Sequence, residues 1–261
     1  MRPKLWYRSR GLRKMESRLG KKVVRNFIKR RLKDNEEVRV LEIGFGEGKV
    51  LLDLRVLFPD KRVKLFGINK KKEGNMHGRN DFLKNARKFG LKVDKNNLPK
   101  CYFYNAGDGL KFKDNYFDLI ISQVSFHYVG DKSKLLEEIW RVLKLNGMAF
   151  LHIDENVRER SPDWMHLNAG TPRFVIYENG GLIKIGDYLN KFNRKGFEIE
   201  LKKNKNRFLI FIKKTLNEKL DLKLNFDKIS SMDLQKISYG DEHKKSWGVW
   251  WGTRSVFNVK R

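Results

Sequence analysis

Three glycines at alternate positions, Gly44, Gly46 and Gly48, stand between two apolar patterns of different period. Residues 38–43 have the apolar character of a buried strand, and an apolar helical pattern resumes at Val50. A buried strand, a glycine turn and a helix in this order usually form a pocket for a nucleotide-like ligand. The sequence therefore predicts a ligand site at this turn.

The spacing of the glycines excludes two common phosphate-binding loops. The dinucleotide fingerprint G-x-G-x-x-G needs glycine at position 49, where the chain has Lys49. The phosphate loop G-x-x-x-x-G-K-[ST] needs glycine at 43 and a hydroxyl at 50, where the chain has Ile43 and Val50. The pattern present, E-x-G-x-G-x-G from Glu42 to Gly48, resembles motif I of the class I S-adenosylmethionine-dependent methyltransferases.

Two further segments resemble the same family. Residues 105–122 (NAGDGLKFKDNYFDLIIS) are similar to the stretch in which an acid after strand 3 precedes an apolar turn and strand 4. Residues 135–153 (LLEEIWRVLKLNGMAFLHI) are similar to the helix and fifth strand that follow, so the resemblance covers 38–153. It implies an α/β fold with a doubly wound, mostly parallel seven-stranded sheet whose seventh strand is antiparallel, a hairpin insertion and terminal extensions.

The resemblance also implies which residues hold S-adenosylmethionine. The glycines would line the methionine end of the cofactor with Glu42 just behind, because a nearby acid suits the cationic groups of the ligand. Asp108 would accept a hydrogen bond from the adenine amino group. Ser122 and Gln123, at the end of strand 4, would face the transferable methyl group. The full set of implied cofactor contacts is Glu42, Gly44, Gly46, Gly48, Asn69, Gly107, Asp108, Gly109, Ser122 and Gln123.

Asn69 departs from the family pattern. After strand 2 the family usually has an acid that grips both ribose hydroxyls, and a carboxamide offers one acceptor oxygen in its place. Weaker but intact ribose binding is therefore expected, with a decayed site or a different alignment as the alternatives. On this interpretation Asn69→Asp should tighten cofactor binding.

The sequence after strand 4, together with the position of the single cysteine, limits the possible methyl acceptors. Carbon-5 methylation of pyrimidines usually needs a cysteine nucleophile, and the single cysteine, Cys101, begins strand 3 at the wrong edge of the sheet. Methylation of exocyclic amino groups typically uses an Asn/Asp-Pro-Pro-aromatic motif, whereas residues 122–129 read SQVSFHYV. Ring nitrogens, hydroxyls, carboxylates or a small molecule remain. His127 is the candidate catalytic base, with a packed histidine as the alternative, and Gln123 is the second catalytic candidate.

Substrate contacts are expected from two regions. Residues 154–185 lie where the family often inserts substrate-recognition elements, although a structural hairpin is the simpler account. Basic residues also stand at or just after the ends of the predicted strands at 63–68 and 197–203, which would end on the same edge of the sheet as the glycine turn. The predicted substrate contacts are Tyr128, Trp164, Arg173, Lys70, Lys202, Lys203 and Lys205.

The elements that position these residues follow from periodicity. Strands are predicted at 38–43, 63–68, 101–105, 117–122 and 148–153, and helices at 50–58, 81–89 and 134–144. A hairpin about Asn179-Gly180 (174–185), a helix at 187–193 and a strand pair at 197–203 and 207–214 complete the pattern. We divide the chain into a basic N-terminal arm or helix (1–33), a methyltransferase domain (34–214) with its insertion at 154–185, and a C-terminal extension (215–261).

The charge of the 261-residue chain is strongly positive. It has 58 lysines and arginines against 31 acidic residues, a formal net charge of +27. Residues 1–33 contain fourteen basic residues and one acid, Glu16. Such a field attracts polyanions, most often nucleic acid. The alternative is a genome whose composition favours lysine codons, which accounts for scattered lysines better than for the arginine-rich segment 1–33. A transit peptide is the alternative for residues 1–33.

Together these features predict an S-adenosylmethionine-dependent methyltransferase that acts on RNA, with tRNA or rRNA favoured over DNA. A methyltransferase of small metabolites and a non-catalytic RNA-binding protein on the same fold are the alternatives. One cysteine excludes a disulfide framework and a cysteine-built metal site, so no metal is expected. No apolar run reaches the length of a membrane span, so a cytoplasmic protein without a membrane partner is expected.

Overall fold

The computed structural model describes residues 10–34, 36–70, 72, 76–123, 125–126, 132–152, 175–178, 181–204 and 207–222. Its helices are α1 (Leu12–Leu19), α2 (Val23–Lys33), α3 (Lys49–Leu57), α4 (Asp81–Lys88), α5 (Lys132–Val142) and α7 (Ile185–Asn193), with short 3-10 helices η1 (Lys95–Asn97) and η2 (Ala106–Asp108). Its strands are β1 (Val38–Ile43), β2 (Val63–Asn69), β3 (Lys100–Phe103), β4 (Phe117–Ser122), β5 (Leu143–His152), β6 (Val175–Glu178), β7 (Gly181–Lys184), β8 (Glu198–Asn204) and β9 (Arg207–Lys213).

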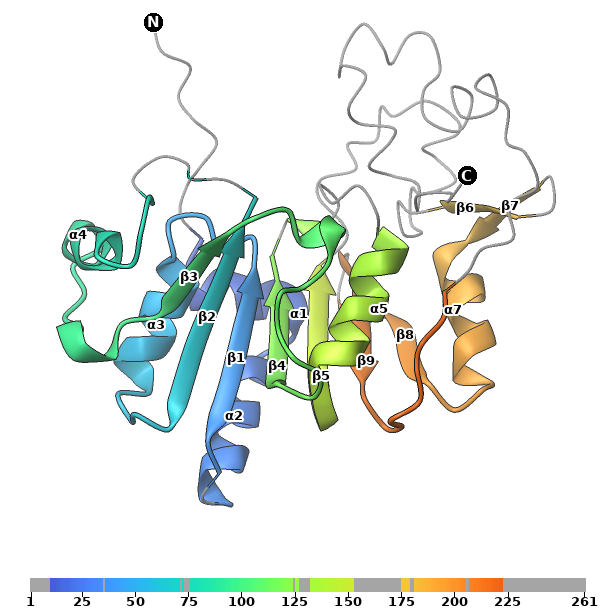
Figure 1. The fold of residues 1–261 in the computed structure, drawn as a ribbon, viewed down its shortest axis with the longest axis horizontal. Coiled ribbons are helices and arrows are strands. Elements are labelled where there is room, and N and C mark those ends of the chain that lie inside the picture. Colours follow the sequence, from blue (N-terminus) through green and yellow to red (C-terminus); the bar gives the residue numbers. More distant parts are fainter. Residues whose placement is uncertain are drawn as a thin grey trace, which may run out of the picture.

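Seven strands form one sheet in the order β3-β2-β1-β4-β5-β9-β8 (Figure 1). β1 to β5 pair in parallel, and β9 is antiparallel to both of its neighbours, β5 and β8. β6 and β7 form a separate antiparallel hairpin. The predicted doubly wound, mostly parallel seven-stranded sheet with a hairpin insertion is confirmed. β1 lies between β2 and β4, so the glycine turn that follows it stands at the point where the strand order reverses, the usual ligand site of such sheets.

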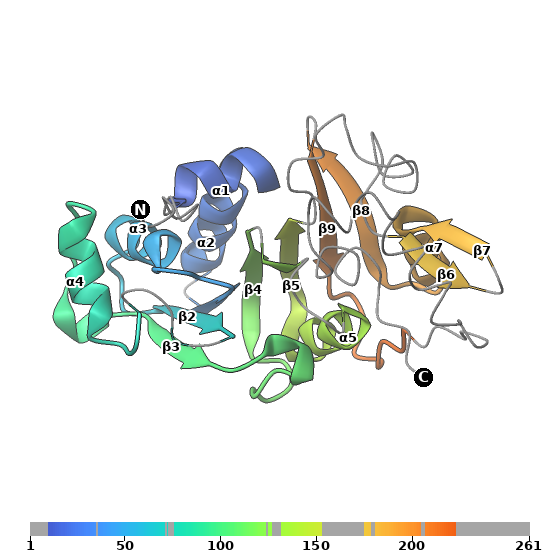
Figure 2. The same ribbon diagram turned by 90° about the horizontal axis from the view of Figure 1, so that it is seen from above.

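Helices cover both faces of the sheet. α1, α2 and α3 lie on one face, and α5 and α7 lie on the other (Figure 2). Side chains of β1 alternate between the two faces of the sheet and so contribute to both hydrophobic cores. Val38 and Val40 are buried in the core under α1 to α3, and Leu41 and Ile43 are buried in the core under α5 and α7. None of the described helices is long and apolar enough to cross a membrane.

The basic N-terminal segment packs on the sheet as two amphipathic helices. The apolar side chains Met15, Val24 and Ile28 of α1 and α2 are fully buried. The buried carboxylate of Glu16, the single acid in this segment, pairs with the guanidinium of Arg25 and so holds α1 against α2. The predicted boundary at residue 33 therefore separates two segments that share one hydrophobic core.

The largest difference between the predicted and observed elements lies at the junction of α5 and β5. The helix predicted over 134–144 ends at Val142, and β5 begins at Leu143 instead of at residue 148. The strand contains an irregularity: Phe117 pairs with Leu143, but Leu119 pairs with Met148. Asn146 accommodates the extra residues with a left-handed φ of 61°, which asparagine tolerates better than most side chains. The Asn-Gly pair is thus a bulge inside the strand and not the end of the helix.

Candidate functional site

All three glycines of the turn have left-handed backbone angles, with φ of 77°, 56° and 79° at Gly44, Gly46 and Gly48. A Cβ atom on Gly44 would collide with the side chain of Ser125, and one on Gly48 would collide with the ring of Phe82. A Cβ atom on Gly46 would meet no atom within 4 Å. The outer glycines are therefore required by packing, whereas Gly46 presents its backbone to open space where a ligand can approach.

Backbone and hydroxyl groups fix the start of the turn. The Gly44 N–H donates to the Ile68 carbonyl at 2.7 Å, which ties the turn to β2. Ser125 Oγ donates to the Ile43 carbonyl at 2.6 Å and lies 2.7 Å from Ser122 Oγ. Ser125 is not among the predicted site residues, although its position three residues after Ser122 is a signal that could have found it.

The far side of the turn is held by α4. The side-chain amide of Asn85 donates to the Glu47 carbonyl at 3.0 Å, and Lys88 Nζ lies 2.7 Å from Glu47 Oε1. The rings of Phe45 and Phe82 pack with their centroids 5.9 Å apart. These contacts fix the conformation of the turn before any ligand is present.

Asn69 is bound to the middle of the turn. Its Oδ1 accepts from the Gly46 N–H, and its Nδ2 donates to the Gly46 carbonyl, each at 3.0 Å. The side chain predicted to meet the ribose is therefore engaged with the protein backbone on one of its sides.

Glu42 lies in the layer between β1 and α3 and is 3% exposed. Burial, with the nearby carboxylate of Asp53, raises its pKa from 4.5 to about 8. Its Oε2 is buried and has no hydrogen-bond partner among the described residues. At pH 7 this carboxyl is mostly protonated, so in the free protein it is a neutral group behind the turn and not the negative charge expected from the sequence.

Asp108 ends η2 and is exposed. Asn105 orients it: the Asn105 carboxamide donates to Asp108 Oδ1 at 2.8 Å and accepts from the Gly107 N–H at 3.2 Å. Gly109 follows with a φ of 122°, a conformation that suits glycine. The acid predicted for adenine is thus presented to solvent on a fixed turn at the same edge of the sheet as Gly46.

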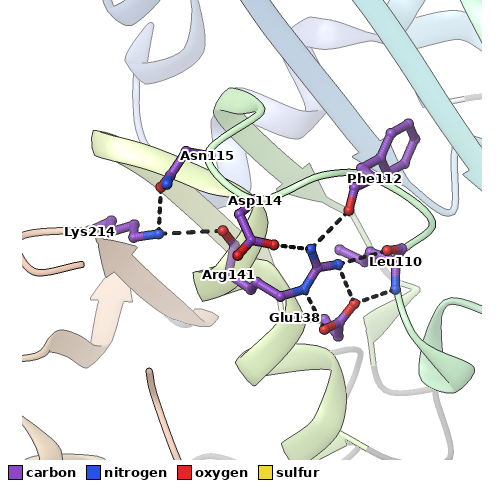
Figure 3. Close-up of polar contacts among 7 residues, drawn as sticks. All are labelled: Leu110, Phe112, Asp114, Asn115, Glu138, Arg141 and Lys214. Carbon is purple, nitrogen blue, oxygen red and sulfur yellow. Dashed lines mark hydrogen bonds and ion pairs between the residues drawn. The ribbon is translucent and has the colours of Figure 1, made fainter. Parts of the chain in front are cut away.

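Two residues of α5 hold the segment after Asp108 (Figure 3). Glu138 Oε2 accepts from the Leu110 N–H at 2.8 Å, and Arg141 Nη2 donates to the Leu110 carbonyl at 2.8 Å. Arg141 also donates to the Phe112 carbonyl at 2.9 Å and pairs with Asp114. Hydrogen bonding to Arg141 lowers the pKa of Glu138, so the pair stays charged and anchors this segment.

The end of β4 is occupied by contacts to protein groups. Ser122 is buried and its hydroxyl meets Ser125. With its carboxamide oxygen turned toward α1, Gln123 accepts from the Met15 N–H at 3.3 Å and from Arg18 Nη1 at 3.2 Å. Gln123 therefore ties α1 to the carboxyl edge of the sheet, a role that sequence reasoning missed because the partner lies more than 100 residues away.

Some of the basic residues predicted at the glycine-turn edge of the sheet lie in the described part of the chain. Lys70 and Lys202 are exposed, and β8 runs parallel to β5 because both are antiparallel to β9, so β8 ends on the glycine-turn edge as predicted. Lys202 Nζ lies 2.8 Å from Glu200 and 3.6 Å from the centroid of the Phe211 ring, and Lys203 belongs to β8. His127, Tyr128, Trp164, Arg173 and Lys205 lie outside the described residues.

The basic residues at the end of α2 do not lie beside the glycine turn. Arg31 Nη2 donates to the Asn146 carbonyl at 3.1 Å, near the start of β5, and the last turn of α2 lies at the amino edge of the sheet (Figure 1). Lys29, Arg30 and Lys33 therefore stand opposite the glycine turn. The reason is that the chain must return to the amino edge to begin β1 at Val38.

Among the described residues there is no group of three or more His, Cys, Asp or Glu that could hold a metal ion.

Residues 41–151, which include the glycine turn and Asp108, match the family model described as a methyltransferase domain. This segment is a methyltransferase domain of the class I S-adenosylmethionine-dependent type. The predicted family, enzyme class and cofactor are thus confirmed, while the individual cofactor contacts remain proposals.

Relatives of this methyltransferase domain differ in the acceptors that their names give. YrhH of Bacillus subtilis is 25% identical over 132 residues, 51% of this chain and 66% of that protein. The ribosomal RNA small subunit methyltransferase G of Malacoplasma penetrans is 32% identical over 119 residues, 45% of this chain and 43% of that protein. The glycine/sarcosine/dimethylglycine N-methyltransferase of Actinopolyspora halophila is 37% identical over 79 residues, 27% of this chain and 14% of that protein. The chain thus spans less than two thirds of each relative.

Proposed function

We propose that this methyltransferase transfers a methyl group from S-adenosylmethionine to RNA, with tRNA or rRNA as the acceptor. The observation that carries the proposal is the placement of exposed basic side chains beside the glycine turn. Arg13 and Lys14 are exposed on α1, the helix that Gln123 ties to the end of β4, and Lys70 follows β2. A polyanionic acceptor is attracted to this edge, where the methyl group would be presented.

The described residues fit the cofactor. The open space at Gly46 leaves room for the methionine end, and the exposed carboxylate of Asp108 can accept a hydrogen bond from adenine. Glu42, held neutral by burial, would lie behind the methionine end. When bound, the cofactor supplies an electrophilic methyl group, so the protein contributes mainly by positioning the acceptor in line with it.

The width of the basic edge favours a polymer over a small metabolite. Lys70 follows β2 and Lys202 lies on β8, and these strands are five positions apart in the sheet, a span of about 24 Å at ~4.8 Å per strand. One small metabolite cannot contact both ends of such an edge, whereas an RNA segment can. Lys202 is partly neutralised by Glu200, so Lys70 and the α1 residues would supply most of the attraction.

His127 is proposed as the base for an acceptor that must lose a proton, since neutral imidazole is available near pH 7. Tyr128, Trp164 and Arg173 are proposed to contact the acceptor. Because Gln123 contacts α1, we propose that it holds this helix in place and takes no part in catalysis. His127 is then the one catalytic candidate of the two. A cytoplasmic location is part of the proposal and rests on the expected reducing environment of a single-cysteine chain.

A small-metabolite methyltransferase is the second candidate, because one relative is named for glycine and its methylated derivatives. Mass spectrometry of nucleosides and metabolites from cells with and without the gene separates the two. The RNA proposal expects one methylated nucleoside to disappear from tRNA or rRNA. An unchanged nucleoside profile together with the loss of a methylated metabolite would replace it with the second candidate.

A further inference from the structure

We propose that Asn69 is a positioning residue that latches the middle of the glycine turn onto the end of β2, and that this pocket requires a carboxamide at position 69. The inference rests on the proposed cofactor site, and it reverses the effect expected from the sequence for an acid at this position. The two hydrogen bonds between Asn69 and Gly46, each 3.0 Å long, carry it.

The two bonds run in opposite directions and involve both backbone groups of one residue. The Gly46 N–H needs an acceptor and the Gly46 carbonyl needs a donor, and the Asn69 carboxamide supplies one of each. A carboxylate has acceptors alone, so it can satisfy only the N–H. The geometry of the turn and the identity of residue 69 therefore form a matched pair.

The latch acts where the turn has no packing of its own. Gly44 is fixed by the Ile68 carbonyl and Ser125, and Gly48 by the Phe45 carbonyl and Phe82, but the Cα of Gly46 faces open space. Asn69 is itself anchored as the last residue of β2, paired with Phe103 and accepting from the Tyr104 N–H at 2.9 Å. A fixed strand end therefore holds the exposed middle of the turn.

The latch also limits what Asn69 can offer to a ribose. After the two bonds to Gly46, one acceptor lone pair and one N–H remain on the carboxamide. It cannot accept hydrogen bonds from both ribose hydroxyls, as a free carboxylate would. We therefore assign Asn69 to shaping the turn that receives the methionine end, with a minor contribution to ribose binding.

Asn69→Asp tests the proposal because the two roles of residue 69 predict opposite changes in cofactor affinity. Loss of the latch should weaken binding, whereas a carboxylate that binds both ribose hydroxyls should strengthen it. At pH 7.5 the variant would set a carboxylate oxygen against the Gly46 carbonyl, about 3 Å away, and release the turn. S-adenosylhomocysteine should bind about tenfold more weakly, whereas 5′-methylthioadenosine, which lacks the methionine end, should change much less. Equal or tighter binding of both ligands by Asn69→Asp overturns the proposal.

Protonation supplies a second readout. A protonated aspartic acid again offers one donor and one acceptor, so the affinity ratio of Asn69→Asp to wild type should rise toward one as the pH falls toward about 4. Asn69→Ala has no group to protonate and should show no such recovery. The control is Asn26→Asp, the same charge change at an exposed position of α2, which should leave binding unchanged.

Amide hydrogen exchange without ligand separates a failure of the latch from a failure of the cofactor assignment. In the wild type the Gly46 amide should be protected, and Asn69→Asp should speed exchange across 44–48 while the β1 amides stay protected. An unprotected Gly46 amide in wild type contradicts the latch, even if the variant does not fold. Protection in a protein that does not bind S-adenosylhomocysteine would leave the latch standing and refute the proposed function.

Discussion

Asn69 holds both the N–H and the carbonyl of Gly46, so the most exposed residue of the glycine turn is fixed by a side chain 23 positions later in the chain. The turn is thereby shaped from the protein side, and its outer side is left free. A ligand that enters there meets backbone groups already in place, which lowers the conformational cost of binding.

Gly46→Ala should weaken cofactor binding about tenfold or more, because a methyl group would enter the space left for the ligand. The left-handed φ of 56° adds a stability cost of about 1–2 kcal/mol. Gly90→Ala is the matched control: its φ is 67°, its Cβ also meets nothing within 4 Å, and it lies beyond the end of α4. Calorimetry should show a similar loss of stability in both variants but a loss of affinity only at Gly46. Equal affinities would contradict the placement of the ligand.

Asp108→Ala should weaken S-adenosylmethionine binding roughly 10- to 100-fold, since a hydrogen bond to a charged group contributes about 1.5–3 kcal/mol. Asp114→Ala is the control, because it removes an exposed carboxylate from the same loop at its ion pair with Arg141. Titration calorimetry on both folded variants checks the result. If Asp114→Ala had the larger effect, adenine would not be bound at Asp108.

Stability should fall as the pH rises from about 5 to 8, and Glu42 should cause part of this fall. Its folded pKa of about 8 lies above its ordinary value of 4.5, so the folded state binds more protons and is progressively disfavoured across this range. A carboxamide cannot ionise, so Glu42→Gln should be more stable than wild type at pH 8 by more than about 1 kcal/mol and nearly equal to it at pH 4.5. Urea unfolding at several pH values measures this. Parallel pH profiles for the two proteins would show that Glu42 is not held neutral.

The basic residues of α1 and α2 should contribute differently to RNA binding. Arg13→Gln with Lys14→Gln should make the slope of log affinity against log salt shallower by about 1.4 to 1.8, because two phosphate contacts are lost. Lys29→Gln with Lys33→Gln removes the same charge at the opposite edge and should leave the slope nearly unchanged. Deletion of 1–33 is a poor test, since it would strip buried side chains of α1 and α2 from the core. Equal effects of the two pairs would mean that RNA is attracted by net charge and not by this edge.

The sequence predicted the sheet and the glycine turn well because these features are local. The apolar run before Gly44 and the strict glycine spacing depend on neighbouring residues, and β1 and α3 follow from them. The roles of Asn69 and Gln123 could not be predicted, because their partners, Gly46 and Arg18, lie 23 and 105 residues away in the chain. The apolar spacing of Val23, Phe27 and Ile28 indicates the helix α2, whereas the basic composition of residues 10–20 concealed α1 and its buried Met15. The pKa of Glu42 depends on tertiary burial, which no spacing in the sequence reports.

The central claim, methyl transfer to RNA, is tested most directly with the purified full-length protein. S-adenosylmethionine labelled in its methyl group is incubated with the protein and either total cellular RNA or a protein-free metabolite extract. The proposed function predicts that label enters the RNA, and that Asp108→Ala and Gly46→Ala reduce the rate. Label recovered only in the metabolite fraction, with none in RNA, would contradict the account.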